Sequence, residues 1–408
     1  MLKAGDIIPL AIEKPAAGGA MIARHEGRVV LVSGGIPGER VQAKITRVAK
    51  GMAHAAAVAI DQPSPDRRDP EGDPLCGGCL YRHIAYPRQL TIKSQVIADA
   101  FTRIGRIELP GPVAVAASPE DGYRMRARLH VRGARFGFFR EGTHDLCDAR
   151  ATRQLLPAAC DTLDRLMAAL QSSGGGEVRE IEVSENVDGS ERVAHLVTAA
   201  PMDPRLLDTL LSVDGLTPGP YVTDTLTIGD AHLTLRRHVL AFFQGNRFLL
   251  RDLVSHVVAH VPAGAALLDL YAGVGLFSVA AAMIRGADAV AIEGDPYSSA
   301  DLRVNGAAAG RVTAVGGAVE AMGARTADVV IVDPPRTGMS PEALTAMLAV
   351  RASRIVYVSC DVATLARDAR KIVDGGYTIE RADAFDLFPN TPHVETVIVF
   401  GKSQDRRI

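Results

Sequence analysis

The predicted fold of this chain is organised around residues 354–366, with the sequence RIVYVSCDVATLA. Its apolar, largely β-branched run Ile355–Val358 predicts a buried parallel strand, and open α/β sheets bind their ligands at the carboxyl ends of such strands. Cys360 follows this strand directly, so its thiol is a candidate nucleophile. The alternative is a buried structural cysteine, because free cysteines are among the most buried residues in proteins.

Upstream, a strand, a glycine-rich turn and a helix start are predicted around the stretch DLYAGVG at 269–275. The glycines let a ligand approach the backbone closely, and the helix start offers free amides. A second apolar run, residues 289–292, ends in Glu293, whose carboxylate can accept both ribose hydroxyls of an adenosine. This pattern fits an NAD enzyme and an S-adenosylmethionine enzyme equally, although Ser278 stands where the dinucleotide fingerprint has Gly or Ala.

A third run, 328–332, ends in the stretch DPPRTG at 333–338, whose prolines stiffen the loop and fix the directions of Asp333 and Arg336. Successive strand ends therefore present Glu293, Asp333 and Cys360 at one edge of a sheet. If the final strand, 397–400, is antiparallel to the others, Glu395 also reaches Cys360. The alternative for Glu395 is an acid in a surface loop.

Length, composition and charge describe a soluble globular chain. Its 408 residues suffice for two to three domains, and 47% are hydrophobic and 23% charged. A net charge of -2 excludes a strongly basic surface over the whole chain. We expect a cytoplasmic protein, since no run approaches the roughly 18 to 20 apolar residues of a membrane helix and the first residues lack a signal sequence. Five cysteines, too few and too unevenly spaced for a disulfide framework, predict reduced thiols.

Residues 1–60 read as short strands separated by turns, which is typical of a small β-barrel. Residues 1–68 hold ten basic and six acidic residues, so this end is locally basic and suits RNA, although a solvated barrel surface is the alternative. The glycine pair at 18–19, GRVV at 27–30 and IPGERV at 36–41 resemble the TRAM domain, an RNA-binding barrel of RNA-modifying enzymes.

The region 61–235 is predicted to be an α+β domain preceded by a linker. A helix is expected over 89–105, and the stretch YRMRARLHVR at 123–132 alternates, so that Arg124, Arg126 and Arg128 share one strand face. With three phenylalanines, at 136, 138 and 139, this face suits phosphate contact and base stacking. The alternative is a solvated face paired with acidic neighbours.

Together, five motifs resemble those of the RNA uracil-5 methyltransferases: FFQGN at 242–246, DLYAGVG at 269–275, DPPRTG at 333–338, SCD at 359–361, and FP through HVET at 388–396. The resemblance implies a class I methyltransferase fold, a doubly wound Rossmann-like sheet, in residues 236–408. This domain would follow the TRAM-like barrel (1–60) and the central domain (61–235), whose helix 89–105 would pack on it. One departure is Val362, where the family usually has Pro.

By the same resemblance, Cys360 adds to C6 of uracil and Glu395 removes the C5 proton after methyl transfer. Gln244, Tyr271, Glu293 and Asp333 would contact S-adenosyl-L-methionine, and Arg336 could balance the enolate charge. The thiol needs a lowered pKa, which we expect from the strand end and nearby positive groups.

The resemblance also raises the question of an iron-sulfur cluster. Cys76 and Cys79 form a Cys-x-x-Cys pair, which is half of such a site. Similar enzymes add a cysteine six residues upstream, here Pro70, and a fourth one, here near Thr152. Cys147 and Cys160 are out of register. We therefore expect a vestigial turn in preference to a four-iron four-sulfur cluster, and the metal content stays open.

These expectations converge on an S-adenosylmethionine-dependent enzyme that makes 5-methyluridine in RNA. The TRAM-like barrel favours 23S ribosomal RNA over tRNA, and no membrane or obligate protein partner is expected. The Asp-Pro-Pro sequence at 333–335 also resembles the loop of base-amine RNA methyltransferases, but such an enzyme has no use for Cys360 or Glu395. An RNA-binding assembly factor that has lost catalysis is the alternative from another class.

Overall fold

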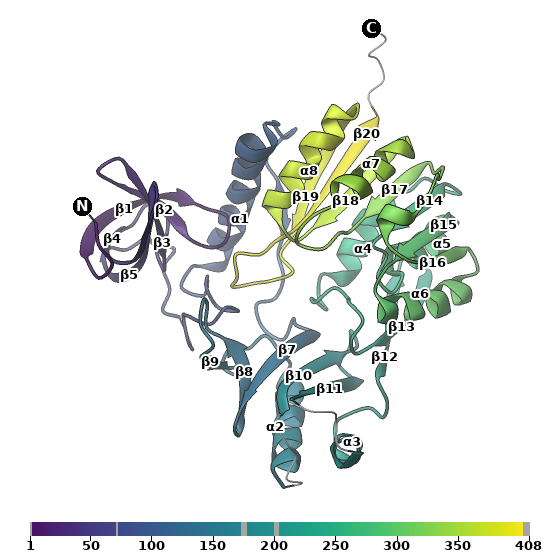
Figure 1. Cartoon of the computed structure of the whole chain (residues 1–408), viewed down its shortest axis with the longest axis horizontal. Helices are drawn as coiled ribbons and strands as arrows, with labels where there is room; N and C mark the ends of the chain where they lie inside the picture. Colours follow the sequence, from purple (N-terminus) through teal and green to yellow (C-terminus); the bar gives the residue numbers. More distant parts are fainter. Residues whose placement is uncertain (1, 71, 173–177, 200–203, 403–408) are drawn as a thin grey trace.

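The computed structural model describes residues 2–70, 72–172, 178–199 and 204–402. Figure 1 shows a small barrel at the N-terminal end, a central sheet below, and a large layered α/β domain that contains the C-terminal half. None of the described helices is long and apolar enough to cross a membrane.

The N-terminal strands form a closed barrel in the order β1-β2-β3-β5-β4, as the turn spacing predicted. Alternate residues such as Leu10, Val30 and Val41 fill its interior. Gly18 and Gly19 have φ of 85° and 94°, which allows the tight connection between the first two strands. The strands are β1 (Ile7–Pro15), β2 (Met21–His25), β3 (Arg28–Ser33), β4 (Arg40–Ala49) and β5 (Met52–Gln62).

The central region is built on an antiparallel sheet of order β11-β10-β7-β8-β9, beside a separate hairpin. Apolar residues of the sheet, such as Leu129 and Ile181, pack with Leu163 and Leu166 of the covering helix α2. The elements are β7 (Arg126–Arg132), β8 (Arg135–Phe139), β9 (Leu146–Asp148), α2 (Pro157–Ser172), β10 (Val178–Glu185), β11 (Arg192–Thr198), α3 (Pro204–Ser212), and the hairpin β12 (Tyr221–Ile228) and β13 (Ala231–His238).

The C-terminal half contains an eight-stranded sheet of order β16-β15-β14-β17-β18-β20-β19-β6, which confirms the Rossmann-like class. Strand β18 is apolar from Ile355 to Val358 because both faces are covered: Ile355 and Tyr357 enter one core, and Val356 and Val358 enter the other. The elements are α4 (Leu250–Ala259), β14 (Ala266–Leu270), α5 (Leu276–Arg285), β15 (Asp288–Glu293), α6 (Pro296–Ala309), β16 (Val312–Gly316), a 3-10 turn (Val319–Ala321), β17 (Val329–Val332), α7 (Pro341–Ala349), β18 (Arg354–Ser359), α8 (Val362–Asp374), β19 (Tyr377–Phe385) and β20 (Glu395–Lys402).

Part of the preceding region also belongs to this sheet. Strand β6 (Ala114–Ala116) pairs with β19 in parallel. Helix α1 (Tyr86–Ala100) continues as a π-helical turn, Phe101–Gly105, and its Ile97 and Phe101 share a core with Leu365 of α8. A Cβ at Gly105 would lie 3.0 Å from the Ala366 carbonyl oxygen, so the turn and α8 approach closely. The chain between the barrel and the central sheet is thus tied to the C-terminal half.

Candidate active site

The carboxyl ends of the parallel strands bring the candidate residues to one edge of the sheet. Tyr271 follows β14, Glu293 ends β15, Asp333 follows β17, and Cys360 follows β18. Strand β20 runs antiparallel to β18 with Thr396 opposite Ser359, so Glu395 begins its strand at this same edge. The antiparallel orientation that the sequence interpretation required is therefore present.

A cavity of about 580 Å³ lies at this edge, and every candidate residue lines it. These residues are Gln244, Tyr271, Glu293, Asp333, Cys360 and Glu395, joined by Arg124, Arg126, Arg336, Phe242 and Phe388 among others. Phe242 was not singled out from the sequence although it stands in the FFQGN motif. Its side chain is 58% exposed, which is unusual for phenylalanine and marks the rim of the cavity.

One side of the cavity is formed by the glycine-rich turn. Tyr271, Gly273 and Gly275 have φ of 59°, 58° and 94°, which turns the backbone sharply between β14 and α5. Glu293 Oε2 accepts a hydrogen bond from the Gly273 amide (2.7 Å), and Oε1 accepts one from the Asp295 amide (2.6 Å). The carboxylate is thereby oriented by two backbone donors at the place expected for adenosine.

The acids Asp333 and Glu395 line the same cavity. Asp333 Oδ2 accepts a hydrogen bond from Gln244 Nε2 (2.9 Å), but burial, aided by the charges of Asp269 and Glu293, raises the pKa of Asp333 to about 7. Burial also raises the pKa of Glu395 well above its usual value, and the Asp333 charge adds to the shift. Raised pKa values make both carboxyl groups better proton acceptors than ordinary acids, and Asp333 can hold or release a proton at physiological pH.

The Cys360 thiol contradicts one expectation. Its pKa is raised to about 12, chiefly by burial and next by the charge of Glu395, whereas the sequence interpretation expected a lowered value. Arg336 lowers the pKa of the thiol as expected, but burial and the adjacent carboxylates outweigh that single cation. Arg336 could be identified as a nearby cation from the sequence, but the extent to which burial desolvates the Cys360 thiol could not.

The arginine strand divides into two parts. Arg124 and Arg126 line the cavity, and Arg126 Nε is buried without a hydrogen-bond partner among the described residues. Burial lowers the pKa of Arg126 to about 10. Arg128, in contrast, is 63% exposed and donates to Glu182 Oε1 (2.6 Å), so it is paired with an acidic neighbour outside the cavity. Arg126 Nη2 lies 3.9 Å from Glu182 Oε2, a longer ion pair with the same carboxylate.

The phenylalanines beside this strand pack largely on the protein itself. Phe136 and Phe138 pack against the core of the central sheet, and Phe139 stacks on His130 at 3.5 Å between ring centroids. Phe136 and Phe138 are therefore half-buried, and their stacking on bases stays a prediction.

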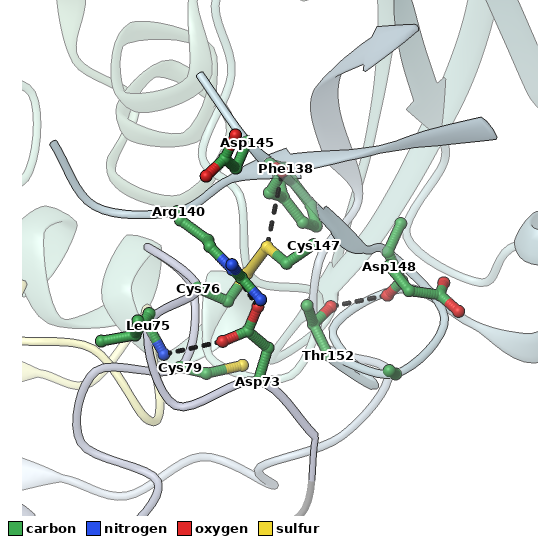
Figure 2. The surroundings of a disulfide bond; sticks show 12 residues. Asp73, Leu75, Cys76, Cys79, Phe138, Arg140, Asp145, Cys147, Asp148 and Thr152 are labelled. Atoms are coloured by element: carbon green, nitrogen blue, oxygen red, sulfur yellow. Dashed lines mark hydrogen bonds and ion pairs between the residues drawn. A yellow bond between two sulfur atoms is a disulfide. The ribbon is translucent and has the colours of Figure 1, made fainter. Parts of the chain in front are cut away.

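The cysteine segment differs from the expectation of reduced thiols. Cys76 and Cys147 form a disulfide (Figure 2). Cys79, Cys160 and Cys360 are free. The bridge forms because the amide of Gly77 donates to the Phe139 carbonyl (3.2 Å), which places Cys76 beside the β8–β9 pair. The disulfide joins cysteines 71 residues apart in the sequence, and their spacing could not reveal the pairing.

The four-iron four-sulfur cluster implied by the family resemblance does not fit these residues. The Cys76 sulfur is already bonded, and the Thr152 hydroxyl donates to the Ala149 carbonyl (2.6 Å). The Arg82 guanidinium contacts both Cys79 Sγ (3.9 Å) and the Thr152 carbonyl (3.3 Å), so a cation lies where a cluster would need room. Within the described ranges, no group of three or more Cys, His, Asp or Glu residues is arranged to hold a metal ion.

Comparisons with known proteins identify the family. Residues 2–58 match the TRAM domain model, and residues 321–403 match the model "tRNA (Uracil-5-)-methyltransferase". The 23S rRNA (uracil(1939)-C(5))-methyltransferase RlmD of Halomonas elongata is 31% identical over 98% of this chain and 90% of its own length. The enzyme of the same name from Acidithiobacillus ferrooxidans is 31% identical over 96% of each chain. The chain belongs to the RNA uracil-5 methyltransferase family.

An RNA uracil-5 methyltransferase takes its methyl group from S-adenosyl-L-methionine, so the NAD interpretation of the glycine turn is excluded, as is base-amine methylation. The crystal structure of Pyrococcus abyssi tRNA (uracil-54, C5)-methyltransferase with S-adenosyl-L-homocysteine shares the fold, with a TM-score of 0.75 and 24% identity over 96% of this chain and 99% of that one. An uncharacterized RNA methyltransferase of Corynebacterium efficiens is 31% identical over 98% of this chain and 96% of its own.

Proposed function

We propose that this enzyme methylates C5 of a uridine in 23S ribosomal RNA through a transient bond between Cys360 and C6 of the base. The observation that carries the proposal is the meeting of Cys360 and Glu395 in one cavity, where the charge of Glu395 acts on the thiol. A thiol and a carboxyl of raised pKa are the two groups that this chemistry needs.

The reaction begins with addition of the thiol. Cys360 loses its proton as its sulfur bonds to C6, and the electrons of the C5=C6 bond move toward O4 of the base. Arg336, which already lowers the pKa of the thiol, balances the enolate charge. Because burial raises the pKa of Cys360, a neighbouring base must take the thiol proton, and we assign this task to Asp333, whose charge acts on the thiol and whose pKa is about 7.

Bound S-adenosyl-L-methionine supplies the methyl group to the nucleophilic C5. Gln244, Tyr271, Glu293 and Asp333 are the proposed cofactor contacts, and Glu293 is oriented for the ribose by the Gly273 and Asp295 amides. Glu395, in its ionised form, then removes the C5 proton, and the electrons of the C5–H bond restore C5=C6 as the C6–S bond breaks. The departing Cys360 thiolate takes back the proton held by Asp333, Glu395 passes the C5 proton to solvent, and S-adenosyl-L-homocysteine is the second product.

The RNA contacts are proposed for two surfaces. The basic barrel would hold the RNA by its phosphates, and Arg124 and Arg126 would hold the nucleotide turned out of its stack into the cavity. Ribosomal RNA is favoured because two relatives that align over nearly the whole chain are named for it. A tRNA substrate is the second candidate, favoured by the family model that residues 321–403 match, which is named for tRNA.

The test combines methyl transfer with trapping. The wild-type enzyme, labelled cofactor and separate 23S rRNA fragments or tRNA transcripts should give labelled 5-methyluridine in the ribosomal RNA. RNA containing 5-fluorouridine, which has no C5 proton to lose, should leave a denaturant-resistant complex with the enzyme. Cys360→Ala should abolish both signals, and Cys160→Ala, which removes a buried thiol of α2, is the matched control. Undiminished methylation by Cys360→Ala would refute the mechanism, and RNA binding without methylation by the wild type would favour an assembly factor.

A further inference from the structure

Helix α1 buries two polar side chains one turn apart, Gln89 and Lys93, on the face toward the loop that precedes β20. Their exposed fractions are 0% and 1%. A lysine is almost never buried to this extent without a partner, because its charge loses hydration. Both side chains therefore need specific contacts within the protein.

Lys93 finds its contacts in the loop. Its Nζ donates to Asp386 Oδ1 (2.5 Å) and to the Phe388 carbonyl (3.1 Å), and Asp386 is itself fully buried. The ion pair is an inefficient source of stability, since two desolvated charges often contribute no more than an apolar pair of similar volume. The bond to the Phe388 carbonyl has a different consequence, because it fixes the backbone next to a side chain that lines the cavity.

Gln89 holds the same loop two residues further on. Its Nε2 donates to Asn390 Oδ1 (3.0 Å), and the Asn390 amide donates to Gln89 Oε1 (3.0 Å). Asn390 has φ of 63°, a left-handed conformation that asparagine tolerates and that surrounding contacts must maintain. Arg68 Nη2 also donates to Asn390 Oδ1 (2.8 Å), and the Tyr81 amide donates to the Asn390 carbonyl (2.9 Å).

These contacts make a clamp, defined here as Gln89, Lys93, Asp386 and Asn390. The clamp holds the loop at two points, and Glu395 follows Asn390 by only five residues. We propose that Lys93 and Gln89 are positioning residues that set the loop so that Glu395 can reach the C5 proton. This inference rests on the proposed function, because it assigns the clamp to the proton-removal step of that reaction.

A positioning role of the clamp predicts a kinetic result that a purely structural role does not. If Glu395 is displaced by a fraction of an ångström to an ångström, proton removal slows by about tenfold to a hundredfold, while attack by Cys360, on a different strand, changes little. The methylated enzyme–RNA adduct should then form at a normal rate and persist. Loss of stability alone would lower formation and release together.

The experiment uses the double variant Lys93→Met with Asp386→Asn, which removes both buried charges at nearly constant volume. The control is Asp99→Asn on the exposed side of the same helix, where Asp99 pairs with Lys14 (2.6 Å). Single-turnover reactions with labelled cofactor are quenched in denaturant, and covalent and free methylated RNA are separated. We expect accumulation of methylated adduct with release at least about tenfold slower in the double variant, and wild-type behaviour in the control.

Release within twofold of wild type in a folded double variant would overturn the proposal. If that variant does not fold, Asn390→Gly carries the test, since glycine keeps the left-handed backbone and removes only the side-chain bonds to Gln89 and Arg68. Wild-type release by folded Asn390→Gly would likewise overturn it. Failure of the wild-type enzyme to form the 5-fluorouridine adduct would instead refute the proposed function.

Discussion

The cavity edge of the sheet and the cysteine segment both carry thiols near charged groups, and they are organised differently. At the cavity edge, Cys360 shares a cavity with three acids delivered by neighbouring strands. In the cysteine segment, Cys76 is bonded to Cys147, and Arg82 lies against Cys79. One arrangement leaves a thiol available for chemistry, and the other leaves a covalent link between distant segments.

The difference follows from what positions each residue. Parallel strands carry the residues that follow them to one edge of the sheet, so three separate motifs meet without direct contact in sequence. The cysteine segment lies in a loop whose place depends on a few backbone contacts, such as that of Gly77 with the Phe139 carbonyl. A thiol at a strand end is therefore positioned by the fold, and a thiol in such a loop by its partners.

At the cavity edge, the substitution Glu395→Gln is expected to reduce methylation more than any change in the cysteine segment. The amide keeps the shape of the side chain and cannot take a proton, so turnover should fall by about 10² to 10⁴. Adduct formation should continue because Asp333 remains to accept the thiol proton. The methylated enzyme–RNA complex should then accumulate on a denaturing gel. The isosteric change at another acid, Glu320→Gln, outside the cavity lining, is the control. Normal turnover by Glu395→Gln would remove the proposed base from the mechanism.

The fold and the cavity residues could be predicted largely from sequence. Strand β18 is a run of apolar residues covered on both faces, and such runs identify their strands without help from distant contacts. The antiparallel direction of β20 was a conditional expectation, and Glu395 depended on it. Strands β6 and β19 were not predicted, because a three-residue strand and a mixed polar strand carry little pattern.

The remaining differences come from contacts and desolvation, which sequence patterns do not encode. The bond between Cys76 and Cys147 joins residues on separate elements, and no local rule pairs them. The raised pKa of Cys360 depends on how deeply a strand end is buried. The clamp of Gln89 and Lys93 could have been suspected from two polar residues at i and i+4 on the apolar face of a helix.

Substitutions at Arg126 and Arg128 test how far the cavity region extends along β7. Arg126→Met removes a guanidinium with an unpartnered Nε from the cavity, so the KM for RNA should rise about tenfold or more, as for a lost hydrogen bond to a charged group. Arg128→Met removes an exposed cation paired with Glu182 and should change the KM less than about twofold. Equal effects of both substitutions on KM at the same salt concentration would indicate a general electrostatic surface extending beyond the cavity.

Removal of the disulfide is expected to have the smallest effect on methylation and a clear effect on stability. Cross-linking residues separated by 71 positions stabilises the fold by about 4 kcal/mol in the chain-entropy model, so a reductant should lower the urea midpoint of unfolding. Thiol titration of the unfolded protein should give three free cysteines before reduction and five after it. The double variant Cys76→Ala with Cys147→Ala should be insensitive to the reductant and should methylate RNA within about twofold of wild type, since the bridge lines no part of the cavity. Iron bound to anaerobically purified protein, with a visible absorption band lost in the double variant, would contradict the bonded arrangement and would make the cysteine segment a metal centre after all.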